Sequence, residues 1–85
     1  MMIWETGIEE KFEKLLGKIP IFMREIAKNK VSKKLESALK EQNHQAATEK
    51  DLVDAFFSET PFGFHGPLKM DMEEFGIDYV KYGHK

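Results

Sequence analysis

Large apolar residues recur at three- and four-residue steps along the first two thirds of the chain, the spacing of one face of an α-helix. The first such stripe contains Trp4, Ile8, Phe12, Leu15 and Leu16. It predicts a helix over about residues 6–16, begun by Thr6 and Glu9 at capping-box spacing. Gly17 is expected to end this helix in the left-handed conformation.

The same pattern predicts two further helices. Pro20 fits the first turn of a helix but not its interior, so Gly17 and Pro20 predict a break before a second helix over about residues 20–42. The apolar positions of this helix are Phe22, Met23, Ile26, Ala27, Val31, Leu35, Ala38 and Leu39. After a polar connection, Thr48 and Asp51 predict a capping box at the start of a third helix. Its apolar residues are Leu52, Val53, Ala55, Phe56 and Phe57.

The chain changes character at Thr60. Residues 60–67 hold two Pro, two Gly and two Phe, a composition that predicts a loop. Asp71 and Glu74 are placed to cap one short helical turn that Gly76 would end, and residues 77–82 are expected to be extended. The predicted fold is all-α: a compact three-helix bundle over residues 1–59, with an irregular, aromatic-rich extension over residues 60–85 packed on the same domain.

Composition narrows the possible functions. The 85 residues are enough for one domain, and the absence of cysteine excludes disulfides, iron–sulfur clusters and thiol catalysis. No apolar run approaches the ~20 residues of a membrane-spanning helix, and no signal-peptide core is present, so we expect a cytoplasmic protein without a membrane partner. The three histidines lack metal-ligand spacing, and no phosphate-binding loop occurs, so neither a metal site nor a catalytic site is predicted.

Charge is distributed unevenly. Residues 20–41 carry six basic and three acidic residues, a balance of +3, whereas residues 49–79 carry two basic and eight acidic residues, a balance of −6. The two halves either attract each other, or the basic face (Lys28, Lys30, Lys33 and Lys34) docks an acidic partner or an anionic ligand. The net charge of −2 argues against a nucleic-acid partner.

Arg24 and His65 are the candidate ligand-binding residues. Arg24 lies near the start of a helix, where the helix dipole disfavours a cation, so a ligand anion or an ion pair with Asp51 or Asp54 is expected to hold it. The glycine-flanked segment of Phe62, Phe64 and His65 suits a haem or chlorin pocket with an axial imidazole. The alternative is an aromatic loop that packs over the core. Trp4 is expected in the core with Ile19 and Phe22.

Several of these residues resemble a known family. The order is Trp4, then Leu16-x-x-Ile-Pro-x-Phe-x-Arg24, Ala27-Lys28, and Ala47-Thr-x-x-Asp-Leu-Val-x-Ala55. It resembles the small C-terminal domain of the light-independent protochlorophyllide reductase, and the similarity covers about three fifths of the chain. Two departures are Ser32, where the family tends to have an acidic residue, and Asn43-His44, where it often has a glycine.

The resemblance implies an accessory role. The reductase transfers electrons through an iron–sulfur cluster to a tetrapyrrole, and its cluster ligands and substrate cavity lie outside this domain. We therefore expect a non-catalytic binding or interaction module, for a tetrapyrrole-like ligand or a protein partner. The alternatives are a helix-turn-helix or histone-like nucleic-acid-binding protein and a structural homodimer. The homodimer would bury Met23, Phe56, Phe57, Phe62 and Phe64, more large apolar groups than three short helices cover.

Overall fold

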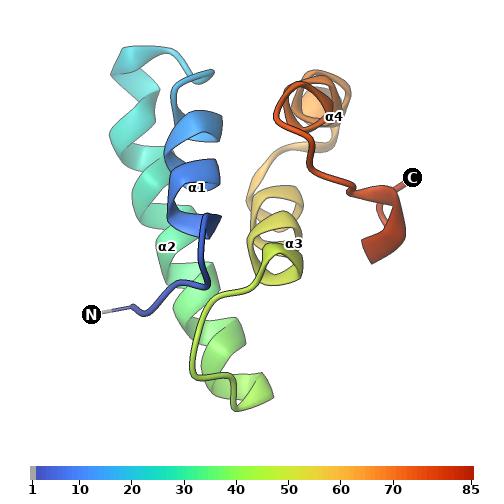
Figure 1. Ribbon diagram of the computed structural model, residues 1–85. Helices are drawn as coiled ribbons and strands as arrows, with labels where there is room; N and C mark the ends of the chain where they lie inside the picture. Colours follow the sequence, from blue (N-terminus) through green and yellow to red (C-terminus); the bar gives the residue numbers. More distant parts are fainter. Residues whose placement is uncertain (1) are drawn as a thin grey trace.

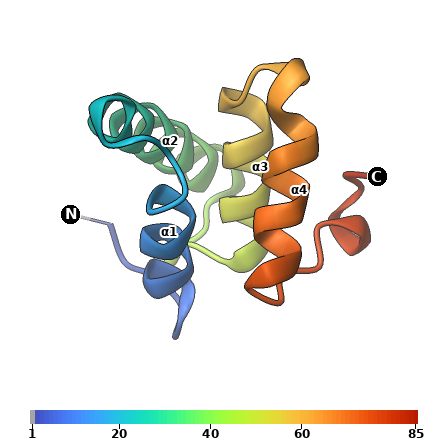
Figure 2. The same cartoon turned by 90° about the horizontal axis from the view of Figure 1, so that it is seen from above.

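Four α-helices make up most of residues 2–85, the part of the chain that the computed structural model describes. They are α1 (Ile8–Leu16), α2 (Ile21–Gln42), α3 (Glu49–Glu59) and α4 (His65–Glu74), with 3₁₀ turns η1 (Phe62–Phe64) and η2 (Val80–Tyr82). The only extended pairing in the described chain is an isolated parallel bridge between Trp4 and Ala47. The predicted all-α class is confirmed. Figures 1 and 2 show α3 in the middle, with α1 and α2 on one side and α4 on the other.

Helix α1 ends where the pattern predicts but begins differently. Gly7 precedes it in the left-handed conformation, with φ 82°, and no side chain caps its start, so the predicted capping box of Thr6 and Glu9 is wrong. The segment before α1 is held instead by its bridge to Ala47, whose N–H donates to the carbonyl of Ile3 at 2.8 Å. Gly17 is right-handed, with φ −62°, so its predicted left-handed conformation is also wrong.

Helices α2 and α3 agree closely with the prediction. Pro20 directly precedes α2, and Asn43 ends it in the left-handed conformation, with φ 56°. At the start of α3 the capping box is complete. The Asp51 N–H donates to Thr48 Oγ1 at 3.2 Å, and the Thr48 N–H donates to Asp51 Oδ2 at 3.0 Å. These boundaries follow from local chemistry, because each depends on residues close together in the sequence.

The core surrounds α3, whose five apolar residues are all buried. Trp4 stacks on Phe12 with ring centroids 5.1 Å apart, and Phe12 meets Phe56 edge to face at 5.9 Å. Ile19 also packs against this cluster. The prediction that Phe22 joins Trp4 and Ile19 in the core is wrong, because the Phe22 side chain is 79% exposed.

The C-terminal segment is more helical than expected. Helix α4 begins at His65 and runs for ten residues, where the prediction had a loop to residue 67 and one short turn. Pro67 is tolerated because the first N–H groups of a helix have no intrahelical partner to lose. Leu68 and Met72, one turn apart, are buried in the same core as the first three helices. Residues 80–82 form η2, so the predicted extended tail is wrong there.

Candidate functional site

The first two turns of α2 carry large apolar side chains that the core does not cover. Phe22 is 79% exposed and Ile26 is 58% exposed, and Ile21 and Met23 are also exposed. Phe22 precedes the buried Val31 by nine residues, about two and a half helical turns, so the two side chains lie on opposite faces. The prediction of one buried stripe along α2 is therefore wrong for its first two turns. Exposed apolar groups gathered in this way are typical of interaction surfaces.

Lysines continue the same face toward the end of α2. Phe22, Ile26, Lys30 and Lys33 follow one another at steps of four, four and three residues, which places them in one row. We call the exposed row of Phe22, Met23, Ile26, Lys30 and Lys33 the α2 outer face. It combines an apolar end with a basic end on one helix.

None of the five lysines of α2 forms an ion pair within residues 2–85. Carboxylates of the acidic half are paired elsewhere: Glu49 with Lys11, Asp54 with Lys50 and His84, and Glu74 with Lys18. The expected attraction between the basic and acidic halves is therefore not made through direct ion pairs with α2. Its lysines remain available to a partner.

Arg24 is used to close the end of α1. Its Nε donates to the carbonyl of Leu16 at 3.0 Å, and its Nη2 donates to the carbonyls of Gly17 at 3.3 Å and Ile19 at 2.9 Å. The last carbonyls of a helix have no partner further along it, and a cation is favourable at a helix C-terminus. Arg24 forms no ion pair with Asp51 or Asp54, contrary to the expected alternative. The guanidinium takes over the role expected of a left-handed Gly17.

His65 closes the end of α3 in a similar way. Its Nε2 lies 2.9 Å from the carbonyl of Thr60 and 3.2 Å from that of Phe57. Since carbonyls only accept, this nitrogen donates. Phe62 is 88% exposed and Phe64 is also exposed, so the predicted packing of an aromatic loop over the core is wrong for both rings. The Phe62 ring reaches only the rim, with its centroid 5.5 Å from that of His65.

A shallow hollow of about 370 Å³ lies beside His65. His84 stacks on Phe57 in its wall, with centroids 4.4 Å apart, and its Nε2 lies 2.6 Å from Asp54 Oδ1. Both imidazoles in the hollow thus have protein partners. Within residues 2–85 no group of three or more acidic or histidine side chains is arranged to hold a metal.

The residues predicted for tetrapyrrole binding do not form one site. Arg24 is bonded to the α1–α2 turn, where Lys18 reaches Glu74 at the end of α4. His65 is the first residue of α4, about 14 Å away along the helix axis. A single ligand held by both side chains would have to span this helix. Tetrapyrrole binding stays a prediction, and no chemical step is derived from it.

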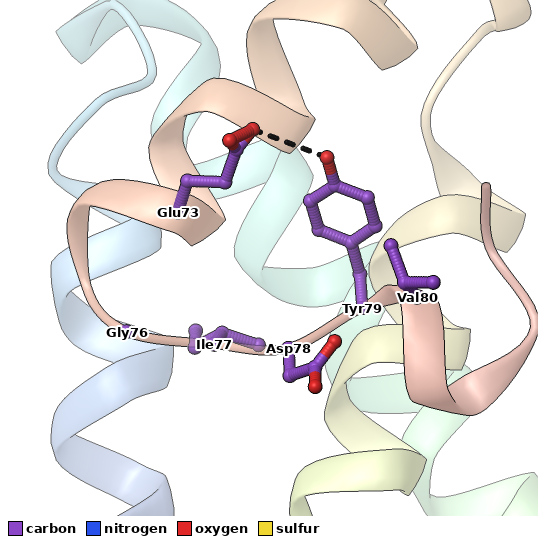
Figure 3. Close-up of a pocket in the computed structure, with 6 residues that line it drawn as sticks. All are labelled: Glu73, Gly76, Ile77, Asp78, Tyr79 and Val80. Atoms are coloured by element: carbon purple, nitrogen blue, oxygen red, sulfur yellow. Dashed lines mark hydrogen bonds between the residues drawn. The ribbon is translucent and has the colours of Figure 1, made fainter.

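A second hollow, of about 340 Å³, lies between the end of α4 and η2 (Figure 3). Glu73, Asp78 and Val80 line it, and the Tyr79 hydroxyl donates to Glu73 at 3.1 Å. Desolvation of the hydroxyl and the neighbouring Glu73 carboxylate raise the pKa of Tyr79. Met70, one turn before Glu73, is 71% exposed. We call Met70, Glu73, Asp78 and Val80 the C-terminal acidic face.

Sequence reasoning missed the burial of Asp51 and its partner His44. Asp51 is 1% exposed, and its Oδ2 accepts from the Thr48 hydroxyl at 3.0 Å and lies 3.1 Å from His44 Nδ1. The signal was present, because Asp51 directly precedes the apolar pair of Leu52 and Val53 on α3. The C-terminal acidic face was also missed, since it depends on where the tail returns.

Comparison of the chain with family models, curated proteins and solved structures gives no significant match. The resemblance to the reductase domain therefore stays a prediction. No helix between residues 2 and 85 combines the length and apolar content that crossing a bilayer requires.

Proposed function

We propose that this chain is a non-catalytic helical interaction module that binds a protein partner through the α2 outer face. The observation that carries the proposal is the row of Phe22, Ile26, Lys30 and Lys33, in which two large apolar side chains are exposed and two lysines have no ion-pair partner in the described chain. A binding role also agrees with the resemblance to a domain appended to a larger reductase.

The chemistry of this face indicates what the partner presents. Burying the exposed part of Phe22 and Ile26 would contribute at most about 1.5–3 kcal/mol for each side chain. Lys30 and Lys33 add little affinity while solvated, but they select an acidic partner and speed its approach. The expected partner surface is an apolar patch bordered by carboxylates.

A nucleic-acid partner explains only part of the same face. Unpaired lysines suit phosphates, but Phe22, Met23 and Ile26 offer phosphates nothing. In a helix-turn-helix arrangement, α3 would be a neighbouring helix, and its apolar residues are buried while Glu59 carries a negative charge at its end. The protein partner is therefore the proposal, and nucleic acid is an outcome of its test.

The test is site-specific photo-crosslinking in the cells that make the protein. A photoreactive amino acid replaces Ile26 in the full chain, and a matched variant carries it at Glu10, exposed on α1. We expect a discrete protein adduct from position 26 that is lost on adding Lys30→Glu and Lys33→Glu and is absent from position 10. Adducts that nuclease removes, or none above the position 10 background, would refute the proposal.

A further inference from the structure

We infer that the partner is a second copy of this chain, whose C-terminal acidic face receives the α2 outer face of the first. This inference rests on the proposed function, because it names the partner for the same surface. The two faces have the same design with opposite charge. Each places exposed apolar side chains beside charged groups that lack an ion-pair partner in the described chain.

The carboxylates of the acidic face are free to meet lysines. Glu73 accepts one hydrogen bond from the neutral Tyr79 hydroxyl, and Asp78 accepts one from the backbone N–H of Lys81 at 3.2 Å. Neither carboxylate forms an ion pair within residues 2–85. Lys30 and Lys33 have the opposite charge and the same lack of a partner. The complementarity of charge therefore favours this occupant over a second α2 outer face, which would bring like charges together.

The hollow gives the apolar end a place to bind. It holds about 340 Å³ and opens between Val80, the Tyr79 ring and the two carboxylates (Figure 3). Met70 borders it one turn earlier on α4. The Phe22 ring fits this volume and would meet apolar atoms on two sides, while Lys30 and Lys33, two to three turns further along α2, lie toward the carboxylates at the rim.

The two faces cannot meet within one molecule. Figures 1 and 2 show α2 and the C-terminal segment on opposite sides of α3. Because the two faces differ, each copy uses one face toward each neighbour, and the contact is head-to-tail. Such a contact forms rings or open chains, and blocking one face on each of two copies leaves a single productive contact.

This property gives the decisive experiment, in which the masses of three purified samples are measured by light scattering. Phe22→Glu with Ile26→Glu blocks the α2 outer face, and Met70→Lys with Glu73→Lys blocks the acidic face. Each double variant alone should have the mass of one chain, and their equimolar mixture should have twice that mass. Wild type should grow in mass with concentration. Raising the salt from about 0.1 M to about 1 M, which shortens the Debye length from about 10 Å to about 3 Å, should reduce this growth.

Two controls keep the result interpretable. Circular dichroism of each variant should match wild type, since the four substituted residues are exposed, and Glu9→Lys with Glu10→Lys on α1 should associate as wild type does. A monomeric wild type, a mixture that stays at one chain mass, or dimers of the acidic-face variant alone would each overturn the inference. A monomeric wild type that still gives an adduct with a different protein from position 26 would refute only this inference and leave the proposed function standing.

Discussion

The start of α2 and the body of α3 are both rich in large apolar residues, yet the structure treats them in opposite ways. In α3 the apolar residues from Leu52 to Phe57 are buried, and they form the centre of the core. In α2 the apolar residues from Ile21 to Ile26 are exposed, and only the later Val31, Leu35 and Leu39 are buried. The difference shows that apolar spacing predicts a helix but not the length over which its neighbours cover it.

The largest expected difference between the two regions is in stability. Leu52→Ala should lower the free energy of unfolding by about 2–5 kcal/mol, because the Leu52 side chain is fully buried. Phe22→Ala should change it by no more than about 0.5 kcal/mol, because Phe22 makes little contact with the core. Urea unfolding followed by circular dichroism measures both. A comparable loss in the two variants would mean that the start of α2 belongs to the core.

The caps of the two helices provide a second comparison. Arg24→Ala removes three hydrogen bonds to carbonyls at the end of α1, and we expect a loss of about 1–2 kcal/mol on unfolding by urea. Arg24→Lys is the matched control, since it keeps the charge but not the forked geometry, and it should recover only part of the loss. An unchanged midpoint for Arg24→Ala would contradict the capping role.

A smaller loss is expected at the start of α3. Thr48→Ala removes one half of the capping box, which should cost about 1 kcal/mol. Thr48→Ser keeps the hydroxyl and serves as the control. If both variants unfolded at the same denaturant concentration, the hydroxyl would not be the stabilising group.

The smallest effect is a pH dependence of the tail. Burial alone would raise the pKa of Asp54, but its hydrogen bonds from Lys50 and His84 outweigh burial and hold the pKa below the ordinary 3.8. A lowered pKa means that the contact stabilises the fold above pH 3.8 and is lost as the pH falls through the folded value. Amide exchange of residues 79–84 should therefore accelerate below pH 3.8.

The matched variant for this prediction is His84→Ala, which removes one of the two donors to Asp54. Its tail amides should exchange faster than wild type already at neutral pH, with a smaller further change on acidification. Equal exchange in the two proteins across the range would show that His84 does not fasten the tail.

Local chemistry explains which parts of the fold the sequence can predict. The break at Gly17 and Pro20 and the cap of Thr48 and Asp51 depend on residues within a few positions of each other, and the structure confirms both. Helix α4 is different, because Gly66 and Pro67 favour a loop locally, while burial of Leu68 against distant residues favours a helix. Tertiary packing decided the outcome there.

The candidate site was less predictable than the fold for a related reason. Arg24 and His65 stand out in the sequence, but their acceptors are backbone carbonyls that only the folded turns bring within reach. The lysines of α2 stand out by charge alone, whereas their lack of ion-pair partners depends on where Lys11, Lys18 and Lys50 lie. The exposed position of Phe22 was available in the sequence, since it falls opposite Val31 on the helix.

The central claim is that the start of α2 is used for binding rather than for folding. Its most direct test is the yield of protein adduct from a photoreactive residue at position 26, measured with and without Phe22→Glu. We predict a loss of about tenfold or more, consistent with removing one buried aromatic anchor, in a protein whose urea midpoint is unchanged. An equal yield from the two proteins would contradict the claim that this face binds a partner.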